Sequence, residues 1–534
     1  MSNLPLPSLL RTGADLLCET LLVNNVNVCF ANPGTSEMHF VAALDRQPAM
    51  KCVLGLFEGV VTGAADGYAR MADKPACTLL HTGPGLANGL ANLHNAKRAG
   101  TPMINIVGDH ATHHIEFDAP LTSDIKSLAQ PMSHWVGYSH SSDSLGDTAS
   151  QAITQALMPP GQIATLVLAA NHSWSPTSTF TPMPVMLPAA KTPNIRAIHE
   201  AAKALLQTGT NQENTVILLA GKALRNEGLQ LAAAIAHTTG AKLLAQQANA
   251  RVERGLGRLM IDRVPYAVDK ALALFAKTKR IVLIGSKAPV GFFAYPGKPS
   301  SMLPDHCEII TVALPQDDLL AALLLLAQGV NATANVKLTA PTMFARPLAL
   351  SLPLGPLNAA SIAQSVVAQM PDQAIVCDES VSSGREFFPM SYHSAPHDYL
   401  QITGGAIGIG IPLATGAALA APNRKVITLQ ADGSAMHTVQ ALWTQAREKL
   451  SVVTIIFSNR RYNILYGELK DVGAGAPGVN ARSMLDLDNP ALDWVLIAKG
   501  MGVEAACAKT SEEFNRVLAA ALAQQGPFLI EALI

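Results

Sequence analysis

The chain reads VITLQADGS at Val426–Ser434 and VVTIIFSNRRY at Val452–Tyr462, and these two stretches decide its fold. Each begins with an apolar run that favours a β-strand, and 438–449 between them predicts a helix. Parallel strands joined by a crossover helix end at one edge of a sheet, so Asp432 and Asn459 should meet there. Their oxygens suit Mg²⁺, and Gly433-Ser434 opens a helix whose N–H groups attract phosphate. The pattern predicts a metal-bridged diphosphate site.

Composition indicates a multidomain protein that acts on small molecules. At 534 residues the chain is too long for one hydrophobic core, so we expect two or three domains. A net charge of −1 gives no reason to expect a nucleic-acid partner, and the apolar runs are too short for a membrane span. Seven scattered cysteines without CxxC spacing indicate buried thiols. The first residues lack a signal-peptide pattern, so we expect a cytoplasmic protein.

Two proline-rich segments, 175–193 and 341–356, divide the chain. Each of the three remaining parts alternates apolar strands with alanine-rich helical stretches, which is typical of an open α/β layer. We therefore predict an α/β fold with three doubly wound parallel-sheet domains, at 1–180, 190–345 and 355–534. No GxGxxG follows the predicted strands of the middle part, so dinucleotide binding is not supported there.

The strand-end pattern is similar to the cofactor motif of thiamin diphosphate (ThDP) enzymes, which begins with Gly-Asp-Gly and closes with two asparagines. This chain departs from the motif at Ala431 and Ser458, neither of which is a metal ligand. Asp-Gly alone is a common turn dipeptide, but the flanking strands and the later asparagine favour the cofactor motif. The resemblance implies three Mg²⁺ ligands and two cofactor contacts: Asp432, Asn459 and the carbonyl of Arg461, with Gly433 and Ser434.

The resemblance covers essentially the whole chain and is closest to the benzoylformate decarboxylase branch of the pyruvate decarboxylase and acetolactate synthase group. It rests in the N-terminal part on four segments: Ala31–Glu37, Leu56–Arg70, His81–Gly85 and Asn88–Asn92. In the family the first segment meets the substrate and the second meets the cofactor. The third places a histidine in the active site.

Three catalytic residues follow from these segments. The resemblance implies that Thr35 lies beside the substrate carboxylate, that Glu58 binds the aminopyrimidine ring of the cofactor, and that His81 transfers protons. Each also has a structural interpretation when taken alone. Thr35 then lies in an ordinary turn, Glu58 is a first-turn acid favoured by the helix dipole, and His81 is a structural residue after a strand.

Two segments of the third part, Asp378–Ser382 and Thr403–Gly408, also resemble cofactor-binding loops. A glycine run alone is weak evidence, although glycine allows a cofactor to approach the backbone closely. The resemblance implies that Ser382 supports the diphosphate, that the Gly405 carbonyl receives the aminopyrimidine amine, and that Ile407 is the apolar wedge that bends ThDP.

The substrate side is less defined. Tyr462 is a predicted cofactor contact, and Ile464, Leu465 and Glu468 fall in the next helix, which in relatives lines the pocket but could equally be core. Phenylalanines at 292 and 293 stand where the related decarboxylase has a second catalytic histidine. The roles of three further histidines stay open: His110, His113 and His114.

These observations predict a ThDP- and Mg²⁺-dependent, non-oxidative 2-oxo acid decarboxylase that forms an enamine intermediate. An acetolactate synthase-like carboligase that makes 2-hydroxyketones is the alternative, and a non-catalytic family member is a further one. The resemblance implies a homodimer or homotetramer with active sites between subunits. The substrate, and whether the middle part binds a nucleotide or flavin, stay open.

Overall fold

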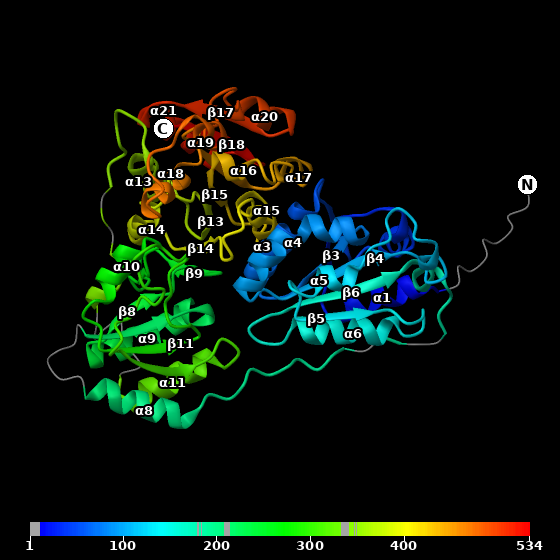
Figure 1. The fold of residues 1–534 in the computed structure, drawn as a ribbon, viewed down its shortest axis with the longest axis horizontal. Coiled ribbons are helices and arrows are strands. Elements are labelled where there is room, and N and C mark those ends of the chain that lie inside the picture. The colour runs from blue at the N-terminus through cyan, green and yellow to red at the C-terminus, as the bar shows by residue number, and fades with distance from the viewer. Residues whose placement is uncertain are drawn as a thin grey trace, which may run out of the picture. The chain divides into compact units, whose positions relative to one another are not determined.

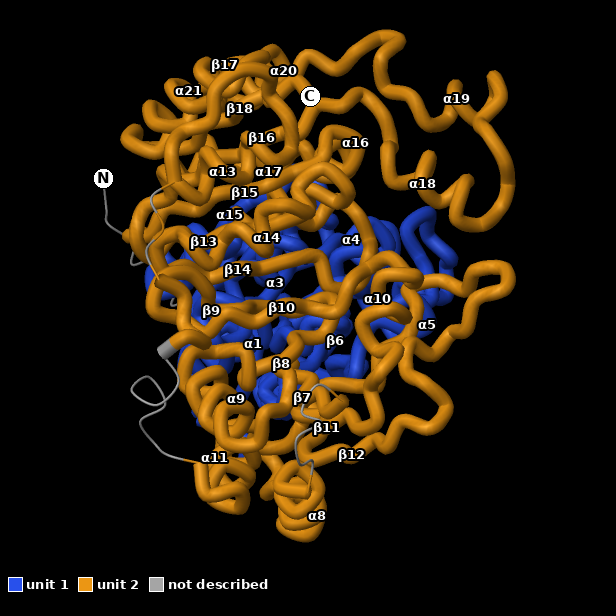
Figure 2. Tube along the Cα trace, turned by 90° about the vertical axis from the view of Figure 1, so that its left-hand side faces the viewer, with its two compact units in different colours: residues 1–189, 415–421 blue, residues 190–414, 422–534 orange. Residues whose placement is uncertain are grey.

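A computed structural model describes residues 11–178, 181–182, 184–207, 214–332, 341–346, 348 and 350–534. Contacts divide the chain into two compact units, shown in Figure 2: unit 1 holds residues 1–189 and 415–421, and unit 2 holds residues 190–414 and 422–534. Three mostly parallel sheets of six, five and seven strands confirm the predicted α/β class (Figure 1). The three domain boundaries stay predictions.

Unit 1 contains a parallel sheet in the order β2-β1-β3-β4-β6-β5. Its strands are β1 (Val28–Asn32), β2 (Lys51–Leu54), β3 (Ala76–Leu80), β4 (Met103–Asp109), β5 (Trp135–Tyr138) and β6 (Ile163–Ala169). Apolar side chains fill both faces of the sheet. Its helices are α1 (Gly13–Val23), α2 (Met38–Asp45), α3 (Glu58–Ala72), α4 (Thr82–Ala99), α5 (Ile125–Ala129), α6 (Leu145–Ala156) and α7 (Ala170–Trp174), with short 3-10 turns at Thr35–Glu37 and Ile115–Phe117.

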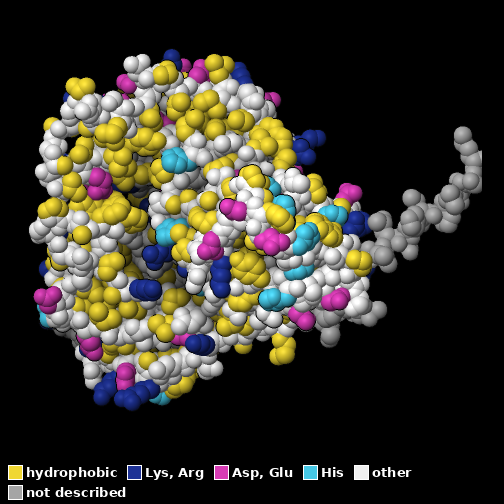
Figure 3. Space-filling model, turned by 45° about the vertical axis from the view of Figure 1, so that its right-hand side comes forward, with side chains coloured by type: hydrophobic (Ala, Val, Ile, Leu, Met, Phe, Trp, Pro, Cys, Tyr) yellow, Lys and Arg dark blue, Asp and Glu magenta, His cyan; other side chains and the backbone are white. Residues whose placement is uncertain are grey.

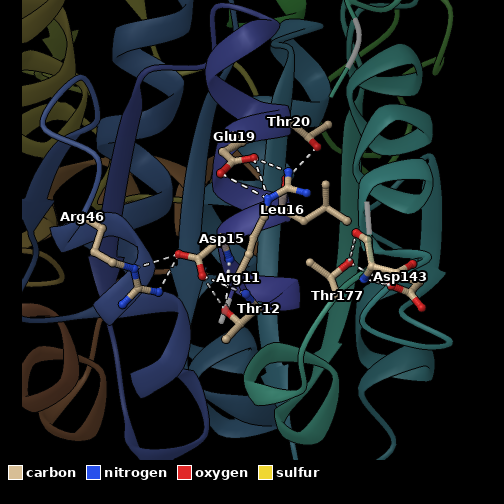
Figure 4. Close-up of polar contacts among 10 residues, drawn as sticks. Arg11, Thr12, Asp15, Leu16, Glu19, Thr20, Arg46, Asp143 and Thr177 are labelled. Atoms are coloured by element: carbon tan, nitrogen blue, oxygen red, sulfur yellow. Dashed lines mark hydrogen bonds and ion pairs between the residues drawn. The ribbon is translucent and has the colours of Figure 1, made fainter. Parts of the chain in front are cut away.

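Local polar contacts fix the start of α1, as Figure 4 shows. Thr12 and Asp15 form a capping box: the Asp15 amide donates to the Thr12 hydroxyl at 3.4 Å, and the Thr12 amide donates to Asp15 Oδ2 at 2.9 Å. Arg46 donates to Asp15 Oδ1 at 2.9 Å from Nε, and Arg11 pairs with Glu19. These contacts tie the start of α1 to the residue that follows α2.

The small residues of α3 allow a close helix contact inside unit 1. An ideal Cβ placed on Gly416 would lie 1.8 Å from the carbonyl oxygen of Ala64, so only glycine fits there. Gly416 belongs to α15 (Gly410–Ala420), and residues 415–421 cluster with unit 1. The small residues of α3 around Ala64 therefore let α15 approach closely.

The first sheet of unit 2 is parallel and has the order β10-β8-β7-β11-β12. Its strands are β7 (Thr215–Leu219), β8 (Lys242–Ala245), β10 (Asp262–Arg263), β11 (Arg280–Ile284) and β12 (Glu308–Ala313). Helices pack on both faces of it through two apolar clusters. They are α8 (Ile195–Leu206), α9 (Asn226–Thr239), α10 (Val268–Phe275) and α11 (Leu319–Gly329), with 3-10 turns at Gly221–Leu224 and Pro341–Met343.

The second sheet of unit 2 has the order β17-β18-β16-β15-β13-β14-β9, and only β9 is antiparallel to its neighbour. Its strands are β9 (Val252–Arg254), β13 (Ala374–Glu379), β14 (His397–Gln401), β15 (Val426–Ala431), β16 (Val452–Ser458), β17 (Glu504–Ala508) and β18 (Phe528–Leu533). Its helices include α13 (Ala359–Gln369), α14 (Phe387–Met390), α16 (Asp432–Ala435), α17 (Ala441–Arg447), α18 (Asn463–Asp471), α19 (Val479–Leu485), α20 (Trp494–Gly500) and α21 (Ser511–Ala523), with a 3-10 turn at Ser391–His393.

Strand β9 joins the middle part of the chain to this last sheet. The fully buried Arg254 donates to the Ser391 hydroxyl at 2.9 Å and to the Phe388 carbonyl at 2.6 Å, and its guanidinium lies 3.6 Å from the centroid of the Phe388 ring. A buried guanidinium needs such partners because its charge cannot be neutralised easily. Sequence position alone therefore does not tell which sheet a strand joins.

One predicted helix is wrong in its extent. Residues 438–449 were expected to form a single helix, but α17 covers only Ala441–Arg447 and α16 precedes it at Asp432–Ala435. Between them the Thr438 hydroxyl donates to the Gly408 carbonyl at 2.7 Å. A β-branched residue that uses its hydroxyl in this way favours a turn over a helix interior.

Hydrophobic side chains are scattered among few charges on the face drawn in Figure 3. None of the helices in the described part of the chain combines the length and apolar character that crossing a membrane requires.

Candidate active site

The ends of β15 and β16 come together as the sequence predicts. The strands pair in parallel with Ala431 opposite Phe457, which places the next residues of both at one edge of the sheet. Asp432 Oδ2 accepts a hydrogen bond from the Arg460 amide at 2.6 Å, and Oδ1 accepts from the Gly433 amide at 2.9 Å. The backbone of both loops therefore orients this carboxylate.

Asp432 has the properties of a cation ligand. It is 2% exposed, and burial raises the pKa of its carboxyl group above the usual range. It forms no ion pair with any residue in the described part of the chain. A buried carboxylate without a positive partner is costly, and a divalent cation is a group that offsets this cost. Asp432 thus fits Mg²⁺.

The two other predicted metal ligands lie in the same loop. Asn459 Oδ1 accepts from the Arg461 amide at 3.1 Å, and Asn459 Nδ2 donates to the Ser383 hydroxyl at 3.1 Å. The Arg461 carbonyl accepts from the Asn463 amide at 2.9 Å. Each oxygen can accept a second bond, since carbonyl oxygens have two lone pairs. The donor set is therefore hard oxygen, as Mg²⁺ prefers.

The predicted phosphate contacts follow directly on Asp432. Ser434 is buried in α16, where its hydroxyl accepts from Gln430 Nε2 at 2.6 Å and donates to the Ala431 carbonyl at 3.1 Å. An ideal Cβ on Gly433 would lie 2.4 Å from the Tyr462 ring, so Tyr462 packs directly on this glycine. Gly433, Ser434 and Tyr462 are thus brought together.

A cavity of about 770 Å³ opens in unit 2 beside this edge. Gly405, Ile407 and Tyr462 line it, whereas Ser382 does not and its neighbours Ser380 and Val381 do. Gly405 has a φ of +79°, which favours glycine. Three of the predicted cofactor residues therefore face one cavity.

Aromatic residues from the middle of the chain form another wall of the cavity. An ideal Cβ on Gly405 would lie 2.6 Å from the Phe292 ring. The ring centroids of Phe292 and Tyr266 are 5.4 Å apart. Phe293 and Arg385 also line the cavity, and the Arg385 guanidinium lies 5.5 Å from the centroid of the Tyr266 ring. Apolar side chains thus stand against the glycine loop.

Unit 1 holds the predicted catalytic residues in the segments that follow β1, β2 and β3. Glu58 begins α3 and is 7% exposed, and its Oε2 accepts from Asn88 Nδ2 at 3.0 Å. An ideal Cβ on Gly85 would lie 2.9 Å from Glu58 Oε1 and 3.4 Å from the His81 Cβ. Glu58 and His81 therefore both lie close to Gly85 in the first turn of α4.

Thr35 lies in the loop that backs onto His81. An ideal Cβ on Gly34 would lie 2.3 Å from His81 Nδ1, so only glycine at position 34 leaves room for the imidazole ring. The side chain of Thr35 itself is exposed. Unit 1 thus brings the Thr35 loop, Glu58 and His81 to one edge of its sheet.

Glu37 is a residue of this site that the sequence did not single out. It is fully buried, and its Oε2 lies 2.8 Å from His81 Nδ1 and accepts from the Gly34 amide at 2.7 Å. Gly108 provides the space, since an ideal Cβ there would lie 1.7 Å from Glu37 Oε1. A carboxylate on Nδ1 fixes the imidazole so that Nε2 is the nitrogen free for proton transfer.

His110, His113 and His114, whose roles the sequence left open, form no metal site in the described part of the chain, where no three His, Cys, Asp or Glu side chains cluster to hold a metal ion. The rings of His110 and His114 are 5.6 Å apart, and His113 is exposed. Their roles stay open.

Comparison with known proteins agrees with this geometry. Residues 11–132 match the model of the "Thiamine pyrophosphate enzyme, N-terminal TPP binding domain", and residues 385–532 match its C-terminal TPP binding domain. Thiamin pyrophosphate is another name for ThDP. The first match contains Thr35, Glu58 and His81, and the second contains Asp432 and Asn459.

Similar proteins span the whole chain. A Mycobacterium tuberculosis protein named "Putative acetolactate synthase large subunit IlvX" is 46% identical over 98% of this chain and 99% of its own length. Benzoylformate decarboxylase from Pseudomonas aeruginosa is 29% identical over 96% of this chain and 97% of its own.

Among solved structures, the ThDP-dependent 4-hydroxybenzoylformate decarboxylase of Rhodococcus jostii RHA1 has a TM-score of 0.81 at 25% identity, over 97% of this chain and 98% of its own. The two matched cofactor domains and the full-length relatives lead to one conclusion. The chain belongs to the ThDP-dependent enzyme family of decarboxylases and carboligases.

Proposed function

We propose that the protein is a ThDP- and Mg²⁺-dependent, non-oxidative decarboxylase of 2-oxo acids with bulky or aromatic side chains. The observation that carries this proposal is the cavity, in which Ile407 and Gly405 of the cofactor loop face Phe292 and Tyr266. Apolar aromatic walls favour an apolar substrate group. Relatives named for benzoylformate and 4-hydroxybenzoylformate support the same class.

The residues of unit 2 would hold the cofactor. Asp432, Asn459 and the Arg461 carbonyl would bind Mg²⁺. The diphosphate would lie on α16 and its flanking loops, with Gly433, Ser434 and Ser382 as contacts, and Gly405, Ile407 and Tyr462 would face the rest of ThDP. Bound ThDP would supply an electron sink for the carbanion that remains when carbon dioxide leaves.

The residues of unit 1 would handle protons and the substrate carboxylate. Glu58, kept in place by Asn88, would donate or accept a hydrogen bond at the aminopyrimidine ring. His81, oriented by Glu37, would move a proton at Nε2, and the exposed Thr35 hydroxyl would receive the substrate carboxylate. We further propose that the active sites lie between subunits, which requires a homodimer or homotetramer. Sedimentation of the active enzyme would test this, because an active monomer would contradict it.

A carboligase is the second candidate, and the position of Phe292 favours it. Its ring packs on Gly405 and offers no proton to a carbanion formed nearby. Slow protonation would leave time for attack on a second carbonyl, which gives a 2-hydroxyketone or an acetolactate-like acid in place of an aldehyde.

A substrate panel separates these functions. Purified protein is stripped of metal and cofactor by a chelator, reloaded with ThDP and Mg²⁺, and incubated with benzoylformate, branched 2-oxo acids and pyruvate, singly and in pairs. We expect carbon dioxide release only after reloading, fastest with benzoylformate. Aldehyde as the main product identifies the decarboxylase, and 2-hydroxyketone identifies the carboligase. Release from no member of the panel would contradict both and favour a non-catalytic protein.

A further inference from the structure

Glu379 is a buried carboxylate that the proposed function does not use. It ends β13 with 1% of its surface exposed, and no ion pair joins it to any residue of the described chain. Oε1 accepts from the Gly408 amide at 2.5 Å, and Oε2 accepts from the Gly410 amide at 2.6 Å. Burial raises the pKa of Glu379 to about 7. Because burying a carboxylate costs stability, we expect Glu379 to hold a functional part of the structure in place.

Glu379 holds the loop that follows Ile407, the predicted wedge residue. Gly408 has a φ of +99°, and its carbonyl accepts from the Thr438 hydroxyl at 2.7 Å. An ideal Cβ on Gly410 would lie 2.1 Å from Gln430 Oε1 and 2.9 Å from the Glu379 Cβ. The loop is therefore held by hydrogen bonds at Gly408 and Gly410, and no free space is left beside Gly410.

Gln430 connects this loop to the phosphate end of the predicted cofactor site. It is fully buried, and its Nε2 donates to Glu379 Oε2 at 3.2 Å and to the Ser434 hydroxyl at 2.6 Å. Above about pH 7, where Glu379 is mostly ionised, the carboxylate only accepts hydrogen bonds, so the amide turns its NH₂ group toward it. Glu379 thereby fixes the amide in the orientation that also donates to Ser434.

This arrangement determines what the Ser434 hydroxyl can offer a ligand. Gln430 donates to one lone pair of the Ser434 hydroxyl oxygen. The Ser434 O–H itself points to the Ala431 carbonyl at 3.1 Å, which is long for an O–H···O bond. A bond to a phosphate oxygen would be shorter and stronger because the acceptor is charged. The hydroxyl is therefore prepared to donate, and an acceptor-only anion is the ligand that suits it.

We propose that Gln430, oriented by Glu379, is a positioning residue that sets the Ser434 hydroxyl as a hydrogen-bond donor to the diphosphate of ThDP. The inference rests on the proposed contact between Ser434 and the diphosphate. The same network ties the Ile407 loop to the phosphate end, so both ends of the cofactor site are held by one buried set of side chains.

A double-mutant cycle tests this inference through ThDP binding, measured by calorimetry on cofactor-free protein at saturating Mg²⁺. Gln430→Leu should raise the ThDP Kd about tenfold, the effect expected of one well-placed hydrogen bond. In a Ser434→Ala background the same change should raise it less than about twofold, because the group through which Gln430 acts is gone. Gln430→Met replaces Gln430→Leu in the cycle if the leucine variant does not fold.

Thr428→Val is the matched control. Thr428 is fully buried two positions earlier on β15, and its hydroxyl has no hydrogen-bond partner among the described residues, so its replacement should leave the ThDP Kd within about twofold. A Gln430→Leu Kd within about twofold of the wild type, or an equal effect with and without Ser434, would overturn the inference. If the wild type binds ThDP but decarboxylates no 2-oxo acid, the proposed function fails while the positioning role stands.

Discussion

Glu37 and Glu379 are two buried glutamates at the sheet edges of different units, and they are held in different ways. Glu37 lies against a histidine that can gain or lose a proton. Glu379 lies against backbone amides and a glutamine, none of which titrates. The edge of unit 1 is therefore suited to moving protons, and the edge of unit 2 is suited to holding a fixed anionic or metal-bound group. Changes in unit 1 should affect turnover, whereas changes in unit 2 should affect cofactor binding and stability.

The largest expected effect tests the unit 1 half of this comparison. Glu58→Gln keeps the size of the side chain and a hydrogen bond with Asn88 but removes the acid–base group. We expect kcat to fall at least about 100-fold, because proton transfer by a positioned group contributes about 10² to 10⁴. The ThDP Kd should change by less than about threefold, which calorimetry measures. Unchanged turnover, or loss of cofactor binding in proportion to turnover, would break the comparison.

The next effect concerns Glu379 and the pH dependence of stability. Burial raises its pKa to about 7 in the folded chain from the ordinary glutamate value of 4.5, so the folded state binds the proton more tightly. The free energy of unfolding should therefore fall as pH rises from about 4.5 to about 7 and then level off, by on the order of 3 kcal/mol.

Glu379→Gln lacks this titration and provides the control. Denaturant unfolding of both proteins between pH 5 and 8 isolates the contribution of Glu379, since other titrating groups are common to both. Parallel stability curves would show that Glu379 does not titrate in this range.

The smallest expected effect concerns Glu37. Glu37→Gln keeps one acceptor for the Gly34 amide but weakens the hold on His81. We expect kcat to fall about tenfold while KM changes less than about twofold, because the residue acts on the orientation of a proton-transfer group rather than on substrate binding. Steady-state kinetics with the best substrate of the panel measures both constants. Ser36→Ala, which removes only the hydroxyl donor to Glu37 Oε1, is the milder comparison. A change confined to KM would assign Glu37 to substrate binding instead.

Local patterns were sufficient for most strands and for the turns that follow them. The apolar runs that begin at Val426 and Val452 form β15 and β16, and the loops carrying Asp432 and Asn459 meet where parallel pairing requires. The helix expected over 438–449 was too long because a bond from Thr438 to a residue 30 positions earlier interrupts it. Short-range rules do not contain such a contact.

The residues that sequence reasoning missed all act through distant partners. Glu37 contacts His81 from 44 positions away, and Glu379 contacts Gly408 and Gly410 from 29 and 31 positions away. Gln430 looked like part of an apolar strand, and only its packing on Gly410 and its bonds to Glu379 and Ser434 show its role. The presence of a polar residue at the end of a strand was the one available signal.

The sequence by itself determined the α/β class, the strand ends that carry Asp432 and Asn459, and the likeness to ThDP enzymes. These depend on hydrophobic periodicity and on short motifs, which are local properties of the chain. The tertiary structure alone decided the aromatic wall of the cavity, the membership of β9 in the last sheet, and the partners of the buried glutamates. A buried polar group is stable only with partners in space, and the folding of distant segments onto one another supplies those partners.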